Sequence, residues 1–252
     1  MILNIFAFIF GAAVGSFLNV CIFRIPARES IVTPLSRCPH CHHPIRFFDN
    51  IPIISFALLR AKCRDCGEKI SWRYPLVELV TGLLTLLLFV KFGLTLNFLV
   101  FFVFTAVLIV ISFIDFDHQI IPDILSLPGI PFFFLSAVFV IKIPWHEALI
   151  GLLVGGGMLF LIAFVYEKIT KREGMGGGDI KLLAMIGAFL GWKSLIFVLL
   201  FSSFTGALIG LIAMVVKKKD TKYAVPFGPF LSAAAVVYIF WGDAFNLLFY
   251  RY

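Results

Sequence analysis

The sequence predicts an all-α polytopic membrane protein with about eight transmembrane helices and one small loop domain outside the bilayer. Apolar residues make up 61% of its 252 positions, and charged residues only 14%. Soluble domains are about 45–50% apolar and about 25% charged. Apolar runs of about 20 residues, the length that crosses a bilayer, also recur along the chain. This composition excludes an ordinary soluble domain.

Eight apolar runs are candidate spans. No basic residue precedes the first run, so we expect a transmembrane helix there and not a cleaved signal peptide. The sixth run is short for a full crossing, and the chain would have six or seven spans if that run were re-entrant. The runs cover about 2–22, 75–91, 96–114, 124–141, 147–166, 179–191, 194–216 and 224–245.

The distribution of Lys and Arg predicts the orientation. With eight spans, 17 of the 21 basic residues fall on one side, and the other side holds only Lys91, Lys142, Lys193 and Arg251. The basic side is expected to be cytoplasmic, with both termini on the opposite side. The net charge of +7 is then a topology signal, so we expect the lipid bilayer and no nucleic acid as a partner.

The polar segment 23–74 holds four of the five cysteines. They form two Cys-x-x-Cys pairs, Cys38 with Cys41 and Cys63 with Cys66, and 21 residues separate the pairs. This spacing is typical of a four-cysteine zinc knuckle, in which each pair binds one edge of a tetrahedral ion. Four thiolates leave no open coordination position, so the zinc is expected to be structural. The alternatives are free thiols or two disulfides, which the reducing cytoplasmic side disfavours.

Three carboxylates follow the third predicted span, at Asp115, Asp117 and Asp123. Asp123 follows Pro122 and starts an apolar run, so it is expected to cap a helix. Asp117 is expected to face the loop. Asp115 ends the span itself, where water solvates it least, and a carboxylate there needs a partner or a proton. Asp115 is therefore a candidate for chemistry.

Another carboxylate, Asp179, follows a glycine-rich stretch that runs from Gly174 to Gly178. Glycine adds no side-chain bulk and lets another chain approach the backbone closely. An extended peptide could therefore lie along this stretch, and the alternative is a flexible turn between helices. Because a carboxylate at a membrane span is costly unless it has a use, Asp179 is the second candidate for chemistry.

The predicted topology brings both candidates to one membrane face. Asp115 ends a span that runs toward the cytoplasm, and Asp179 begins a span that leaves it, 64 residues later. Two carboxylates held close together share a proton at neutral pH. The ionised one can act as a base on water while the protonated one polarises a carbonyl group, as in an aspartic protease. Each acid alone would be interpreted as a helix cap or as the partner of a lysine.

Together these residues resemble those of the bacterial type IV prepilin peptidases, the leader peptidase/N-methyltransferase family of membrane aspartic proteases. The resemblance covers nearly the whole chain. It rests on Gly15-Ser-Phe-Leu-Asn19-Val-Cys-Ile-Phe-Arg24-Ile-Pro26, the two cysteine pairs, Arg73-Tyr-Pro-Leu-Val-Glu78, Asp115 to Asp123, and Gly174-Met-Gly-Gly-Gly-Asp179-Ile-Lys181.

The resemblance implies an enzyme of the bacterial inner membrane, with its active site facing the cytoplasm. Such enzymes remove the basic leader of type IV prepilins and type II secretion pseudopilins, and Asp115 and Asp179 match the family's catalytic aspartates. Members with the cysteine-bearing region also methylate the new N-terminal residue, commonly phenylalanine, using S-adenosylmethionine. The chain has no glycine-rich nucleotide fingerprint after a strand, so the methyl-donor site is expected within 23–82 without named residues.

We therefore predict a first transmembrane helix at 1–22, a cytoplasmic zinc-binding region at 23–74 and a transmembrane aspartic peptidase domain at 75–252. Two other functions also fit a pair of membrane carboxylates. A presenilin-like intramembrane aspartic protease shares the Gly-x-Gly-Asp pattern but cuts within transmembrane substrates. A proton-coupled transporter could use the pair as a relay, although its carboxylates would be expected near the bilayer midplane. A further acid, Glu78, lies just inside the second span and is expected to pair with a basic loop residue.

Overall fold

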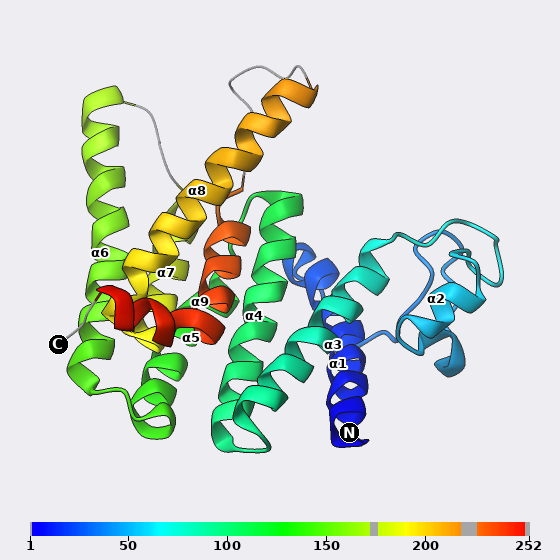
Figure 1. Ribbon diagram of the computed structural model, residues 1–252. Helices are drawn as coiled ribbons and strands as arrows, with labels where there is room; N and C mark the ends of the chain where they lie inside the picture. Colours follow the sequence, from blue (N-terminus) through cyan, green and yellow to red (C-terminus); the bar gives the residue numbers. More distant parts are fainter. Residues whose placement is uncertain (1, 172–175, 218–225, 250–252) are drawn as a thin grey trace. The chain divides into compact units, whose positions relative to one another are not determined.

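The computed structural model describes residues 2–171, 176–217 and 226–249. All regular secondary structure in this part of the chain is helical, and two isolated β-bridges are the only strand-like pairs. The all-α prediction is therefore confirmed. The elements are α1 (Ile2–Ala27), the 3-10 helix η1 (Phe47–Asn50), α2 (Ile54–Leu58), α3 (Arg73–Phe92), α4 (Leu96–His118), α5 (Asp123–Ser136), the π-helix η2 (Ala137–Ile141), α6 (Trp145–Thr170), α7 (Gly177–Leu190), α8 (Trp192–Lys217) and α9 (Gly228–Phe249) (Figure 1).

Seven of the described helices are long and apolar enough to cross a membrane: α1, α3, α4, α5 continued by η2, α6, α8 and α9. The protein is thus a multi-pass membrane protein, as predicted. The remaining predicted run forms α7, which has only 14 residues. At 1.5 Å per residue this helix is about 21 Å long, less than the hydrocarbon thickness of about 30 Å.

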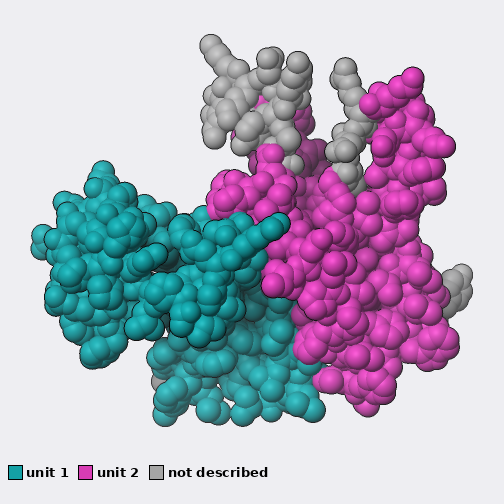
Figure 2. Space-filling view, turned by 180° about the vertical axis from the view of Figure 1, so that it is seen from behind, with its two compact units in different colours: residues 1–110 teal, residues 111–252 magenta. Residues whose placement is uncertain are grey.

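The chain divides into two compact units, residues 1–110 and residues 111–252 (Figure 2). The boundary lies inside α4, so the last two turns of that helix belong to the second unit. In the first unit, the side-chain amide of Asn19 on α1 donates a hydrogen bond to the carbonyl of Tyr74 at the start of α3, at 3.1 Å. The guanidinium of Arg24 binds the loop that follows α1, at the carbonyls of Ser30 and Pro34. Asn19 therefore holds the start of α3 against α1, and Arg24 holds the loop that follows α1.

Helix α7 forms the centre of the second unit. It packs against α5, α6, α8 and α9, and every residue from 182 to 189 is buried. The backbones of α6 and α7 come so close that a Cβ on Gly151 or on Gly187 would overlap the other residue's carbonyl. Residues 182–189 are all apolar and all buried, which is the pattern of a core helix.

Candidate active site and cysteine cluster

Asp115 lies in the last turn of α4 and is buried, with 5% of its surface exposed. Its Oδ2 accepts a hydrogen bond from the backbone N–H of Gly228 at 2.9 Å. Gly228 is the first residue of α9, and the first N–H groups of a helix have no partner within it. The positive end of the helix dipole also favours a carboxylate at this position. A Cβ on Gly228 would lie 2.7 Å from Oδ2, so this contact needs glycine.

Asp179 lies in the first turn of α7 and is partly buried. Its carboxylate interacts electrostatically with that of Asp115. Both residues belong to the second unit, and one is at the end of a helix while the other is at the start of one. The fold therefore brings together two acids that are 64 residues apart in the sequence.

Ile121, in the loop between α4 and α5, lies against the first residues of two helices. A Cβ on Gly178 of α7 would be 2.8 Å from the Cβ of Ile121, and a Cβ on Gly228 of α9 would be 3.3 Å from its Cδ1. The side chain is buried, with 9% exposed. Ile121 thus holds the starts of α7 and α9 next to the loop that follows Asp115. Sequence reasoning missed both Ile121 and Gly228, although two consecutive isoleucines between His118-Gln119 and Pro122-Asp123 were a signal for the first.

The other two acids of this region have different surroundings. Asp117 is exposed, as expected for a residue facing the loop. The prediction that Asp123 caps α5 is wrong, because Pro122 occupies the N-cap position and Asp123 is the first helical residue, without a side-chain capping bond. Its Oδ1 instead accepts a hydrogen bond from Nζ of Lys181 on α7 at 2.6 Å. This ion pair joins the first turns of α5 and α7.

The glycine-rich stretch divides into parts with different surroundings. Gly174 lies outside the described residues. A Cβ on Gly176 or Gly177 would meet no atom within 4 Å, whereas one on Gly178 would crowd Ile121. The last glycine is therefore needed for helix packing, and the two before it border open space.

The four paired cysteines form one cluster in the first unit. One sulfur atom from each of Cys38, Cys41, Cys63 and Cys66 lies within 4.8 Å of all the others, and the sulfur atoms of Cys38 and Cys66 are 3.9 Å apart. Tetrahedral zinc with bonds of about 2.3 Å requires sulfur atoms about 3.8 Å apart. All five cysteines of the chain are free, which rules out the disulfide alternative in this structure.

Both pairs are presented by the same backbone turn. The N–H of the first cysteine donates to the carbonyl five residues later, at 3.0 Å for Cys38 and 2.7 Å for Cys63. The residue four positions after each of these cysteines has a positive φ, +57° at His42 and +71° at Gly67. Each turn is closed by an isolated antiparallel β-bridge. The repeated geometry points all four sulfur atoms to one place.

The local field also favours a thiolate at Cys38. Burial alone would raise the pKa of Cys38, but hydrogen bonds from the backbone of Cys41 and His40 and from neighbouring thiols lower this pKa to about 7. Zinc binds cysteine as the thiolate, and Cys38 is the thiol of the cluster that ionises most readily, since the pKa of Cys41 is raised and that of Cys66 is raised to about 12. The four sulfur atoms fit the ion by their spacing. The histidines beside the first pair are exposed and outside the cluster.

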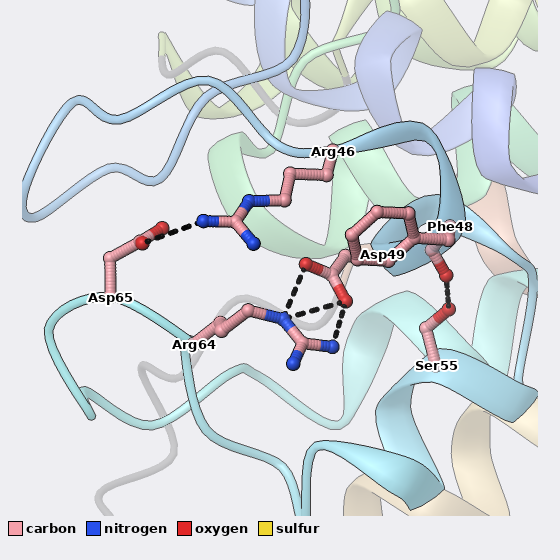
Figure 3. Close-up of polar contacts among 6 residues, drawn as sticks. All are labelled: Arg46, Phe48, Asp49, Ser55, Arg64 and Asp65. Atoms are coloured by element: carbon pink, nitrogen blue, oxygen red, sulfur yellow. Dashed lines mark hydrogen bonds and ion pairs between the residues drawn. The ribbon is translucent and has the colours of Figure 1, made fainter.

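Ion pairs join the second cysteine turn to the rest of the loop (Figure 3). The guanidinium of Arg64, between Cys63 and Cys66, binds both carboxylate oxygens of Asp49, with the shortest distance 2.6 Å. Arg64 thereby lowers the pKa of Asp49. A longer contact of 3.8 Å links Arg46 to Asp65.

Glu78 is buried near the start of α3, but the expectation that it pairs with a basic residue is wrong. Its Oε2 accepts a hydrogen bond from the backbone N–H of Ile53 at 2.7 Å. Ile53 precedes α2 and has a φ of +62°, which is rare for a β-branched residue. A buried carboxylate thus stabilises an unusual backbone conformation at the start of α2.

Two family descriptions match this chain. Residues 9–92 match the bacterial peptidase A24 N-terminal domain, and residues 102–211 match the type IV leader peptidase family. A relative from Myxococcus xanthus is 43% identical over 83% of this chain and 63% of its own length. Relatives from Stutzerimonas stutzeri and Pseudomonas aeruginosa are 40% and 38% identical over 94% and 92% of this chain, and 90% and 88% of their own lengths.

All three relatives are named prepilin leader peptidase/N-methyltransferase. No solved structure significantly matches the chain. The identity of about two residues in five, over nine-tenths of both chains, places the protein in one family with these enzymes. The chain therefore belongs to the type IV leader peptidase family of membrane enzymes.

Proposed function

We propose that the protein is an aspartic endopeptidase of the bacterial inner membrane, with Asp115 and Asp179 as its catalytic residues. Its substrates are type IV prepilins and type II secretion pseudopilins, from which it removes the basic leader at the cytoplasmic face. The observation that supports this proposal is that two carboxylates from distant helix ends lie near enough to influence each other electrostatically, in a chain whose relatives are named prepilin leader peptidases.

The chemistry follows from the two carboxylates. Close together they share one proton. The ionised carboxylate removes a proton from water, and the resulting nucleophile adds to the scissile carbonyl while the protonated carboxyl donates a hydrogen bond to the carbonyl oxygen. Proton transfer to the departing amine then breaks the peptide bond. The N–H of Gly228 occupies Oδ2 of Asp115, so this bond orients the carboxylate and leaves Oδ1 to face the reacting groups.

The helix-end location of the two acids favours a peptidase over the alternatives. Asp115 lies in the last turn of α4 and Asp179 in the first turn of α7. A transporter relay is expected near the bilayer midplane, and an intramembrane protease cuts within the span of its substrate. An acid pair at helix ends instead suits cleavage in front of a hydrophobic helix, where a leader ends.

The second proposed activity is methylation of the new N-terminal residue, commonly phenylalanine, with S-adenosylmethionine as the methyl donor. The names of the relatives support it, and no residue is assigned to the donor. The four cysteines would hold a structural zinc ion in the region 23–74, between the first transmembrane helix at 1–22 and the peptidase domain at 75–252.

The test is cleavage of a purified pilin precursor by the full-length protein in detergent. Asp115→Asn and Asp179→Asn should each reduce the cleavage rate by about a thousandfold or more, because neither variant can share a proton between two carboxylates. Asp117→Asn is the matched control, since it removes an exposed acid two residues from Asp115. Near-normal cleavage by either aspartate variant would refute the assignment. Absence of cleavage by the unmodified protein would favour the transporter.

A further inference from the structure

A groove lies between α2 and the first turns of α3, within the first unit. Its volume is about 640 Å³, and its surface is almost entirely apolar. Its walls include Ile53 and Phe56 on one side and Trp72, Leu76 and Leu79 on the other. One charged residue, Arg60, lines its edge. Neither the proposed peptidase chemistry nor the cysteine cluster uses this groove.

The groove has a defined shape because polar and aromatic contacts hold its two walls together. The carboxylate of Glu78 on α3 binds the backbone of Ile53 just before α2. The rings of Phe56 and Trp72 meet edge to face, with centroids 4.7 Å apart. The wall residues therefore come from two elements that are fixed to each other, and the groove is a preformed site.

Three cations lie on the two backbone segments that meet at Ala61, one of the residues that line the groove. The backbone that carries Arg60, Ala61 and Lys62 runs beside the backbone of Lys69 and Ile70, through a hydrogen bond of 2.8 Å from the N–H of Ile70 to the carbonyl of Ala61. Lys62 and Lys69 oppose each other across an antiparallel bridge, and like charges in that arrangement repel. A bound anion would relieve this repulsion, so an apolar groove adjoins a place suited to an anion.

The surroundings of the groove indicate where such a ligand comes from. One wall consists of the first turns of α3, a candidate membrane span. Large apolar side chains beside the groove are strongly exposed, with 57% of Ile54, 77% of Leu58 and 75% of Trp72 uncovered. Trp and apolar side chains with this exposure are typical of the membrane interface. The groove thus lies beside exposed side chains of the kind that contact a membrane interface.

We infer that this groove binds an anionic phospholipid, with an acyl chain against Phe56, Trp72 and Leu79 and the phosphate group beside Arg60, Lys62 and Lys69. A phospholipid combines the two chemistries that the site offers, an apolar chain and an anion. Basic residues next to a membrane span attract anionic headgroups in the same way. The inference does not depend on the peptidase activity, and a bound lipid would fix the cysteine-bearing loop against the membrane.

The test measures quenching of Trp72 fluorescence in the full-length protein, purified in detergent and freed of lipid. Phosphatidylglycerol or phosphatidylcholine with brominated acyl chains is added, and the same titration of Trp72→Phe gives the signal of the other three tryptophans. Phosphatidylglycerol should quench Trp72 at a concentration at least tenfold lower than phosphatidylcholine. Equal concentrations for the two lipids would overturn the inference.

Paired variants test the two halves of the site. Arg60→Gln with Lys69→Gln should weaken phosphatidylglycerol binding about 30-fold, since each cation near a membrane surface contributes about a fivefold effect. Arg28→Gln with Arg37→Gln removes two other exposed cations of the same loop and should change nothing. Ala57→Phe, which fills the groove, should weaken both lipids equally.

Two results would contradict the inference. One is equal binding of phosphatidylglycerol by the Arg60/Lys69 and the Arg28/Arg37 double variants. The comparison holds if the circular dichroism spectra of both variants match that of the unmodified protein. The other is displacement of the quenching lipid by an apolar pilin peptide at a lower concentration than by unlabelled phosphatidylglycerol, which would make the groove a peptide site.

Discussion

The cysteine cluster and the aspartate site bring together distant residues in different ways. The cluster consists of two copies of one short turn, each closed by its own hydrogen bonds and β-bridge within about eight residues. The aspartate site has no such local unit. It requires the end of α4, the loop with Ile121, and the first residues of α7 and α9.

This difference predicts how each site responds to change. A site built from local turns depends on its ligand, because a loop of about 50 residues has little apolar core of its own. A site built from helix ends depends on helix packing, and a small change in one helix start displaces a carboxylate. Removing the metal should therefore affect mainly the cysteine cluster, and disturbing helix packing should affect mainly the aspartate site.

The largest expected effect separates the two sites. Cys38→Ser combined with Cys63→Ser should lower the zinc content from about one ion per chain to near zero, because each pair loses a thiolate. Asp179→Asn should keep its zinc, while its cleavage rate falls further than that of the cysteine variant. Metal analysis and the precursor assay on the same preparations measure both. Zinc at full occupancy in the cysteine variant would show that the cluster is not the metal site.

The next effect concerns Gly228. Gly228→Ala places a methyl group 2.7 Å from Oδ2 of Asp115, so the carboxylate must move and kcat should fall by about tenfold to a hundredfold. KM should stay close to normal, because the added methyl group contacts Asp115 and Ile121 and not the open side of Gly176 and Gly177. Gly157→Ala is the matched control, since a Cβ there meets no atom within 4 Å. A change in KM alone, or equal kcat for both variants, would contradict the positioning role.

A smaller effect is expected at the ion pair of Asp123 and Lys181, which joins α5 to α7. The pair is partly exposed, with 59% and 34% of the two side chains uncovered. Lys181→Gln should therefore cost less than about 1 kcal/mol of unfolding free energy. Thermal unfolding of Lys181→Gln, Asp123→Asn and the double variant measures the coupling. Additive effects of the two single changes would show that the contact contributes nothing.

The smallest effect is a pH dependence in the cysteine-bearing loop. Arg64 lowers the pKa of Asp49, so the pair stabilises the loop above the usual aspartate pKa of about 4, and this contribution is lost as the pH falls through the lowered value. The difference in unfolding midpoint between the unmodified protein and Asp49→Asn should be largest near pH 7 and should disappear in acid. Asp65→Asn, whose contact with Arg46 is longer, should show a smaller difference. A difference that persists at pH 3 would show that charge is not the cause.

Much of the fold and the clustering of the four cysteines could be predicted, because spacing and hydropathy are local properties of the sequence. Two Cys-x-x-Cys pairs indicate their own geometry. Charge counting led us to expect Asp115 and Asp179 at one membrane face, and the structure has them at the end of α4 and the start of α7. The short apolar run after Asp179 was also correctly singled out as too short for an ordinary crossing.

The partners of buried acids could not be predicted, because most of them are backbone groups. Gly228 donates to Asp115 across 113 residues, and Glu78 binds the N–H of Ile53 where a basic side chain was expected. Nearly every residue has an N–H, so the sequence carries no signal for which one is close. The prediction that Asp123 caps α5 failed for a different reason. Its position before an apolar run suggested a helix cap, but its side chain forms an ion pair with a side chain, that of Lys181.

The burial of residues 182–189 of α7 would limit how a substrate reaches Asp179, if Asp179 is catalytic as proposed. Protein surrounds residues 182–189, so a substrate helix cannot pack along this helix from the lipid. In its first turn, no atom of the described residues would lie within 4 Å of a Cβ on Gly177, or on Gly176 just before it. We therefore expect a polypeptide to approach the start of α7 end-on, so that the depth of its first turn in the membrane would set the distance to the cut. The position of the cleaved bond would then depend mainly on how deeply the substrate's hydrophobic helix inserts into the membrane. The amino-acid sequence around that bond would have a smaller influence.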